Sequence, residues 1–332
     1  MRPRALVVLA AMLLLPACSG GTTQRAAATD PAVSQSPATA VTSDDRYLVL
    51  ARVLHERGVE VWFEADLVKR WLEGPAALDR AVRRLGMLAD QVPVAGFKIA
   101  DELGYDDGIT SVAQATAFLR DSRAALNRVA PGTEVLVDIL VPQLGCPEGD
   151  EGCRAGAARA HPAATIAGLT SYLKAGLLDR VDLSTGLRDG SVSAMQTDQQ
   201  HAWAEVQRLG WSDLTRMQAR KALAAPLGYP DDPEQARDAA RTYIDLPVQG
   251  GAGAVDIWTW RQSYQGQLVG ILAPDLHPNA LWRELVRRKQ AGTLLFTHMT
   301  PSVLPDDPAG LGRECDLVAQ AFGAVFVAAG TG

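Results

Sequence analysis

The sequence predicts an α/β protein built as a (β/α)8 TIM-type barrel, and three observations lead to that fold class. Eight short runs rich in Val, Ile, Leu and aromatic residues recur roughly every 38 residues, which is the size of a βα unit. Stretches of helical period separate these runs. A doubly wound sheet usually has six strands, so eight strands favour the barrel.

Each predicted strand is a short apolar or alternating run bounded by polar or turn residues. In chain order the strands are Val59–Asp66, Val94–Asp101, Thr133–Val141, Arg180–Gly186, Leu214–Lys221, Ala254–Arg261, Thr293–Met299 and Ala324–Ala329.

Between the strands, apolar residues recur at helical spacing over residues 75–91, 112–129, 162–176, 193–209, 232–245, 278–291 and 309–322. The chain stops soon after the eighth strand, so that strand has no helix after it. The segment from Asp44 to His55 offers an N-cap, apolar residues at helical spacing and Gly58 as a stop. We expect this N-terminal helix to fill the place of the missing eighth helix.

The composition is that of a globular protein. Of 332 residues 47% are hydrophobic and 21% charged, with 32 Lys and Arg against 38 Asp and Glu for a net charge of −6. The negative charge argues against a nucleic-acid partner. We expect a monomer without a bound cofactor.

The first residues resemble the lipobox signal of bacterial lipoproteins. Arg2 and Arg4 precede an apolar stretch that is too short to span a membrane, and Leu15-Pro-Ala-Cys18 follows it. The resemblance implies cleavage after residue 17 and a lipid on Cys18. An ordinary secretory peptide with an incidental Cys is the alternative.

Residues 18–44 contain few large apolar side chains, so we expect a disordered tether between the anchor and a single barrel domain over 45–332. The protein would then be extracytoplasmic and held at the cell membrane by its lipid.

Three further cysteines fit an oxidising compartment. Cys146 and Cys153 flank a short polar loop and could form a disulfide, and the alternative of a metal site has no nearby His or second CxxC. Cys315 lies in an apolar helical stretch and is expected to be a buried free thiol.

Polar side chains gather near the ends of the predicted strands, where barrel enzymes carry their active sites. Alternation along each strand sends these residues to the barrel mouth, although the parity of the strand that holds His298 is uncertain. The candidates are Glu64, Asp66, Lys98, Asp101, Glu102, Tyr105, Asp138, Asp182, Gln218, Arg220, Asp256, Trp258, Trp260, Gln262 and His298.

With acids and Trp residues at the strand ends of a secreted barrel, the sequence resembles extracellular glycoside hydrolase-like proteins. It matches no diagnostic signature of a particular family. No Glu follows the fourth or seventh strand, where the large two-glutamate clan needs one, and the chitinase-type DxxDxDxE run is absent. The resemblance implies hydrolysis of a polysaccharide or oligosaccharide by two carboxyl groups. Glu102 as acid with Asp138 as its partner is the first pair, with Asp182 and Asp256 in reserve, and Trp258 and Trp260 would stack on the sugar.

Two alternatives stay open. The chain could be a carbohydrate- or peptidoglycan-binding lipoprotein without turnover, or a Schiff-base lyase using Lys98, although the acids around Lys98 would keep it protonated. No HxH pair is present, so we expect no metal.

Overall fold

The computed structural model describes residues 42, 44–185, 191–211, 228–264 and 267–328, together with the backbone of 215–219. The predicted signal peptide, Cys18 and nearly all of the predicted tether lie outside this range. None of the helices in this range combines the length and the apolar composition of a membrane-spanning segment.

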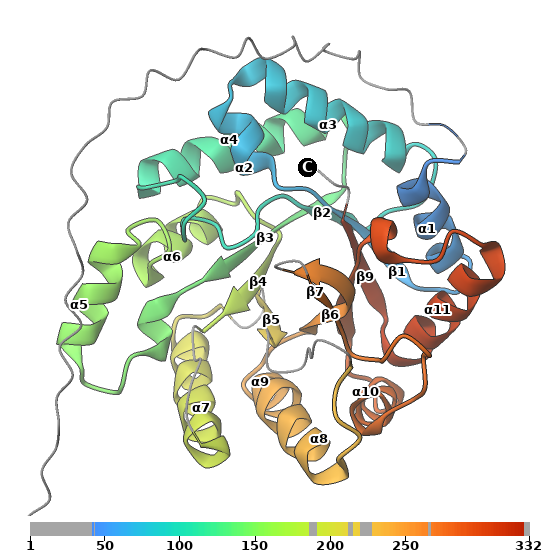
Figure 1. Ribbon diagram of the computed structural model, residues 1–332. Helices are drawn as coiled ribbons and strands as arrows, with labels where there is room; N and C mark the ends of the chain where they lie inside the picture. The colour runs from blue at the N-terminus through green and yellow to red at the C-terminus, as the bar shows by residue number, and fades with distance from the viewer. Residues whose placement is uncertain are drawn as a thin grey trace, which may run out of the picture. The chain divides into compact units, whose positions relative to one another are not determined.

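All eight predicted strands are present, and they pair in parallel. They are β1 (Glu60–Glu64), β2 (Gly96–Lys98), β3 (Glu134–Leu140), β4 (Arg180–Ser184), β5 (Thr215–Ala219), β6 (Val255–Tyr264), β8 (Leu295–Met299) and β9 (Ala324–Ala328). Their order in the sheet is β5, β4, β3, β2, β1, β9, β8, β6, and β5 also pairs with β6. The result is a curled, parallel-dominated α/β sheet that resembles a TIM barrel (Figure 1).

Helices surround this sheet in Figure 1, as the βα rhythm predicted. They are α1 (Arg46–His55), α2 (Leu67–Leu72), α3 (Pro75–Ala89), α4 (Val112–Val129), α5 (Glu151–Ala160), α6 (Ile166–Lys174), α7 (Val192–Arg208), α8 (Pro233–Ala240), α9 (Leu246–Gln249), α10 (Ala280–Gln290) and α11 (Pro308–Ala321). A π-helical turn, Arg241–Asp245, joins α8 to α9. The helix predicted over residues 232–245 therefore continues through α9 to Gln249.

The N-terminal helix α1 forms as expected. The Asp45 side chain caps it by accepting hydrogen bonds from the backbone N–H groups of Tyr47 and Leu48. Leu50 and Leu54 are buried, and α1 packs against β1, β9 and α11. The helix therefore lies beside β1 and β9, the first and last strands, and we call the junction of these two strands the seam.

The sheet separates two apolar regions. The large core lies between sheet and helices. The smaller one consists of alternate strand residues whose side chains point to the other face: Trp62, Leu136, Ala254, Phe296, Ala324 and Phe326. In this small core the Trp62 ring meets the edges of Phe296 and Phe326 at centroid distances of 6.1 and 6.2 Å.

One hairpin was not predicted. After the register of β6 against β8 shifts between Ile257 and Arg261, β6 continues and pairs antiparallel with β7 (Gln267–Gly270). The shift also breaks the simple alternation of side chains on which the assignment of Trp260 depended.

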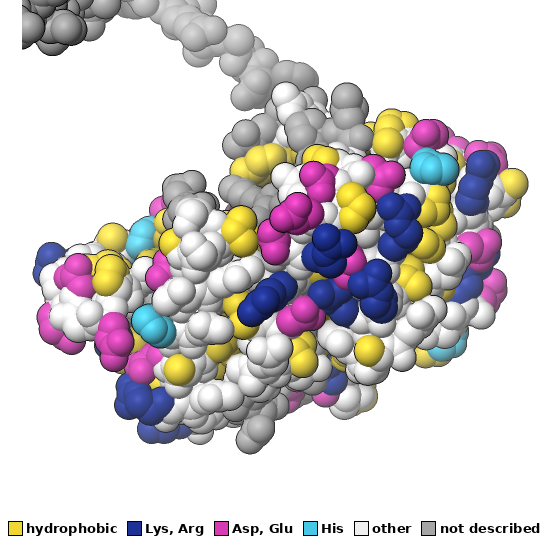
Figure 2. All heavy atoms as spheres, turned by 90° about the horizontal axis from the view of Figure 1, so that it is seen from below, with side chains coloured by type: hydrophobic (Ala, Val, Ile, Leu, Met, Phe, Trp, Pro, Cys, Tyr) yellow, Lys and Arg dark blue, Asp and Glu magenta, His cyan; other side chains and the backbone are white. Residues whose placement is uncertain are grey.

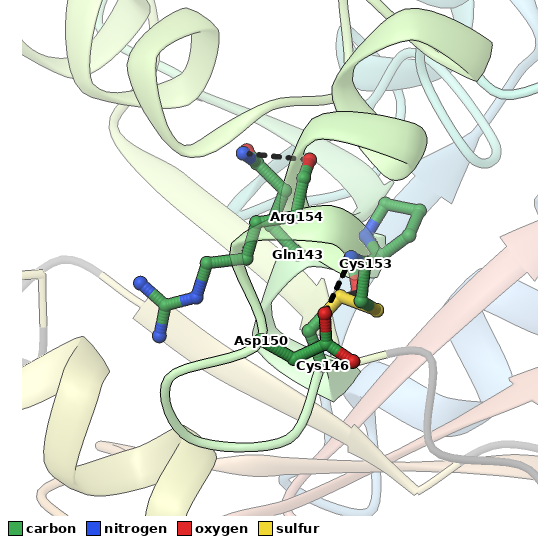
Figure 3. Close-up of a disulfide and its surroundings, with 6 residues drawn as sticks. Gln143, Cys146, Asp150, Cys153 and Arg154 are labelled. Carbon is green, nitrogen blue, oxygen red and sulfur yellow. Dashed lines mark hydrogen bonds between the residues drawn. A yellow bond between two sulfur atoms is a disulfide. The ribbon is translucent and has the colours of Figure 1, made fainter.

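The predicted disulfide between Cys146 and Cys153 is confirmed, and Cys315 is buried and free. Figure 3 shows the bridge at the start of α5, where the Asp150 carboxylate accepts a hydrogen bond from the Cys153 backbone at 2.9 Å. The bridge joins the chain just after the short helix η1 (Pro142–Gly145) to the first turn of α5.

Charged side chains of both signs lie close together on the face shown in Figure 2. Surface ion pairs of the described residues, such as Arg283 with Asp231 at 2.7 Å and Arg57 with Asp316 at 2.6 Å, match this mixed pattern.

Candidate functional site

Six ionisable side chains from six of the eight parallel strands form one cluster on the face opposite the helices. We call it the charged ring, and its members are Glu64, Lys98, Asp138, Asp182, Asp256 and His298. All six have the parity of the small core, and the Lys98 ammonium lies 5.3 Å from the centre of the Phe326 ring. The small core therefore forms an apolar floor beneath the ring.

Lys98 is fully buried among carboxylates. Its Nζ lies 2.8 Å from Glu64 Oε1, 3.4 Å from Asp101 Oδ1 and 3.9 Å from Asp138 Oδ2. Asp101 is more than half exposed and Glu64 about one-fifth exposed, whereas Asp138 is fully buried. Solvent therefore reaches the ring at Glu64 and at Asp101, on the edge of the ring.

His298 bridges two carboxylates. Its Nδ1 lies 2.7 Å from Glu64 Oε2, and its Nε2 lies 2.6 Å from Asp256 Oδ2. The imidazole is almost completely buried, so these two acids fix its orientation. The sequence left the parity of this strand open, and the structure places His298 inside the ring.

Asp182 is the least satisfied member. It is fully buried on β4, and no donor among the described residues gives a hydrogen bond to either of its carboxylate oxygens. Its carboxylate lies with Asp256 and His298 in a group whose ligand atoms are all within 4.8 Å of one another.

Burial and neighbouring charge move the pKa values of the ring in opposite directions. Burial alone would raise the pKa of Glu64, but the charges of Lys98 and His298 outweigh it and lower that pKa to about 2. Burial would lower the pKa of His298, but Asp256 and Glu64 raise it to about 9. Burial and the charge of Asp256 both raise the pKa of Asp182 and hold it well above the usual range. Burial would also raise the pKa of Asp256, but His298 outweighs burial and lowers it.

Three predicted site residues on the segments that follow β1 and β2 lie outside the ring. Asp66 caps α2 by accepting a hydrogen bond from the Val68 backbone. Glu102 is half-buried on the loop after β2, in a left-handed backbone conformation with φ of 50°. Tyr105, on the same loop, stacks on His161 at a centroid distance of 3.9 Å.

The two predicted stacking tryptophans have different surroundings. The Trp258 indole N–H donates to Gln262 at 2.9 Å, and its ring meets Tyr264 edge-on. Trp260 is buried, and its indole donates to Glu314 of α11 at 2.7 Å. Trp260 therefore faces the helices and belongs to the large core.

The side chains of two other predicted residues lie outside the described part of the structure. Gln218 lies on β5 opposite Asp256 in the strand register, but its side chain is outside the described part of the structure. Arg220 lies outside the described residues altogether.

No protein-family model and no curated protein matches the sequence. Solved structures align over most of the chain with low scores. A 2,3-dimethylmalate lyase of the PEP mutase/isocitrate lyase superfamily is 13% identical, with 85% of this chain and 80% of that chain covered and a TM-score of 0.38. The carboxyl transferase domain of Rhizobium etli pyruvate carboxylase is 11% identical, with coverages of 85% and 42% and a TM-score of 0.43. A β-glycosidase is 13% identical, with coverages of 86% and 76% and a TM-score of 0.36.

The prediction of a glycoside hydrolase is wrong, because the stacking surface that it needs is not formed, although its reserve acids Asp182 and Asp256 do come together. Trp260 cannot stack on a sugar from within the core, and Glu102 lies on a loop while Asp138 is buried beside Lys98. The same burial of Trp260 removes the basis of the carbohydrate-binding alternative.

The Schiff-base alternative is wrong as well. Such chemistry needs a neutral amine, and the contacts of Lys98 with Glu64 and Asp101 hold an ammonium ion.

Every member of the ring was among the predicted site residues, but the grouping of Asp182, Asp256 and His298 within it was not predicted. The close approach of Asp182, Asp256 and His298 joins three strands that are distant in sequence. A single sequence carries no spacing signal for such a group, although an inward parity for His298 would have suggested it.

Proposed function

We propose that the chain is an enzyme whose reaction centre is the charged ring, and that it works by polar chemistry. In such a site carboxylates and an imidazole fixed in advance stabilise the charge that develops on a reacting substrate. The observation that carries this proposal is Asp182: a fully buried carboxylate without a hydrogen-bond donor among the described residues, placed beside another acid.

Such an arrangement is unfavourable for folding. Burial removes the hydration of the Asp182 carboxyl, and the charge of Asp256 and the hydrogen bond between the two acids favour its protonated form, so that its pKa is raised. Barrels fill this region with apolar side chains when only stability matters. Proteins keep unfavourable polar groups at functional sites, where they accept a loss of stability.

The charges of the ring also suggest a substrate class. Five carboxyl groups, including Asp101 at the edge, face one Lys and one His among the described residues. Lys98 is already engaged by three of the acids. This surplus of negative charge favours an uncharged or cationic substrate over a phosphorylated one.

The proposal is tested by stability before any substrate is known. In metal-free protein, Asp182→Asn should raise the melting temperature, because it replaces an acid that is buried beside Asp256 by a side chain of nearly the same shape that cannot ionise. Glu314→Gln is the matched control. Glu314 is equally buried but pairs with Arg261 at 2.8 Å and accepts from Trp260, so its substitution should lower the melting temperature. A drop for both variants would show that the ring serves stability and would refute the proposal.

We further propose that the curled sheet is a complete (β/α)8 barrel in which α1 takes the place of the eighth helix. The parallel pairing of β5 with β6, at Met217 with Val255 through Ala219 with Ile257, supports closure. The packing of α1 against β1 and β9 supports its role in covering the seam.

We also propose that the chain is an extracytoplasmic lipoprotein held at the membrane through Cys18. The lipobox-like sequence and the Cys146–Cys153 disulfide support this location, because disulfides persist in oxidising compartments.

A further inference from the structure

We infer that Asp182, Asp256 and His298 form a binding site for one divalent transition-metal ion at the centre of the charged ring. The inference rests on the proposed function in one respect, since it gives the same reaction centre a cofactor. The group combines two carboxylates and one imidazole, all buried, with ligand atoms within 4.8 Å of one another.

The spacing is close to what one ion requires. Zinc binds carboxylate oxygen and imidazole nitrogen at about 2.0–2.2 Å in a tetrahedral arrangement, so two ligand atoms on one ion lie about 3.4 Å apart. The 2.6 Å between His298 Nε2 and Asp256 Oδ2 would therefore widen by about 0.8 Å, and ligand atoms as far as 4.8 Å apart would approach by up to about 1.4 Å. Rotation of the Asp182 and Asp256 carboxylates supplies movements of that size without a change in the strands.

The surroundings of the Asp182 carboxyl are a second observation, separate from the spacing of the three side chains, that points to a bound ion. Its two oxygens receive no hydrogen bond from the described residues, while its side chain points into the group from β4. A buried carboxylate is normally satisfied by donors or by a cation. A metal ion would satisfy Asp182 and would also remove its repulsion from Asp256.

Glu64 completes the arrangement from outside. A metal-bound histidine usually gives the N–H of its other ring nitrogen to a carboxylate, which fixes the ring and strengthens the metal bond. Glu64 already holds Nδ1 of His298 at 2.7 Å, which leaves Nε2 to face Asp256 and the ion. If an ion bound, the proton between Nε2 and the Asp256 carboxylate and the proton that burial favours on Asp182 would both leave to solvent, so that one neutral imidazole and two carboxylates would face the ion.

The donor set selects among metals. Imidazole with carboxylates suits zinc, manganese, iron or cobalt, whereas calcium and magnesium prefer oxygen ligands alone. Three protein ligands leave at least one coordination position for water or substrate, as in catalytic metal sites.

The test is metal binding by the purified full-length protein after treatment with a chelator. We expect equilibrium dialysis against Zn²⁺ or Mn²⁺ to give one tightly bound ion per chain, and Mg²⁺ or Ca²⁺ to bind at least tenfold more weakly. Asp182→Asn and His298→Gln should each weaken Zn²⁺ binding at least tenfold. Glu314→Gln, a buried acid outside the ring, should bind as the wild type does.

A second measurement does not depend on affinity alone. Co²⁺ added to the chelator-treated protein should give visible absorption bands of a site with imidazole and carboxylate ligands, and His298→Gln should lose or shift them. Circular dichroism of each variant checks that it is folded. If the folded Asp182→Asn protein bound Zn²⁺ as tightly as the wild type, or if the wild type bound no transition metal, the inference would be wrong.

The outcomes separate this inference from the proposed function. A wild type that binds no ion, with Asp182→Asn more stable than the wild type, would remove the metal and leave the reaction centre. A loss of stability in the metal-free Asp182→Asn protein would overturn the proposed function even if Zn²⁺ bound to the wild type.

Discussion

Two carboxylates hold His298 in position by hydrogen bonds, Glu64 at one ring nitrogen and Asp256 at the other. Lys98 owes its burial to three acids within 3.9 Å. In both cases a charged or polar side chain is stable inside the protein only because its partners come from other strands. At this scale, the environment of a side chain decides its role.

Trp260 illustrates a side chain that is structural. Trp260→Phe should lower the free energy of unfolding by about 1–3 kcal/mol, because it removes a buried donor to Glu314 and leaves a small cavity. Urea denaturation would measure the change. Trp258→Phe is the control, and its half-buried position predicts a smaller loss. Equal losses for the two variants would contradict the assignment of Trp260 to the core.

Cys315 should be unreactive in the folded protein. Burial raises the pKa of its thiol to about 12, so far less than one per cent is thiolate at pH 9. Native protein should therefore resist iodoacetamide at pH 9, and addition of urea should expose a reactive thiol. The same shift lowers stability as the pH rises from 9 toward 12, because the unfolded chain loses the thiol proton first. Rapid alkylation of native Cys315 would refute this.

At the scale of elements, the disulfide and α1 each hold together a part of the structure that strand pairing alone does not hold. The Cys146–Cys153 bridge ties the chain after β3 to the start of α5, the insertion that precedes α6. Helix α1 covers β1 and β9 with buried leucines. Neither element contributes a side chain to the charged ring.

Reduction of the disulfide should destabilise the protein modestly. A closed loop with a sequence separation of 7 gives only about 2–3 kcal/mol in the chain-entropy model. Thermal melting with and without a reductant would measure the change. Thiol counting on denatured, unreduced protein with Cys18→Ser should find one free thiol, Cys315, and three would contradict the bridge.

Helix α1 should be an integral part of the domain. Leu54→Ala should lower the free energy of unfolding by about 2–5 kcal/mol, since Leu54 is fully buried beneath the helix. Chemical denaturation would measure it, with Val53→Ala, at a half-buried position of the same helix, as the milder control. A Leu54→Ala protein as stable as the wild type would mean that α1 does not cover the seam.

At the scale of the whole molecule, the proposed anchor and the reaction centre are independent. Cys18→Ser should move the protein from the membrane fraction to the soluble fraction, because the lipid is the only attachment that we propose. The melting temperature of the domain should stay the same, since Cys18 precedes the first described residue. Fractionation followed by immunoblotting checks the location. A Cys18→Ser protein that stayed with the membrane would contradict the anchor.

The sequence alone determined the eight parallel strands, the helices that alternate with them and the composition of the ring, but it did not predict α2, α5 or β7. Period and turn residues are local signals, so all eight parallel strands and α1 were predictable, as was the short disulfide loop. Even the inward parity of Glu64, Lys98 and Asp138 followed from alternation along single strands.

The tertiary structure decided which side chains meet and which do not. Trp260 turns toward the helices because the register of β6 shifts, and a register depends on the neighbouring strand. Asp182, Asp256 and His298 meet because three strands far apart in the sequence share one sheet. The local sequence pattern determines which side chains each strand carries toward the interior. Only the pairing between strands decides which of these side chains lie close together. For this reason the structure has a buried cluster of acids and imidazole where the sequence predicted a sugar site.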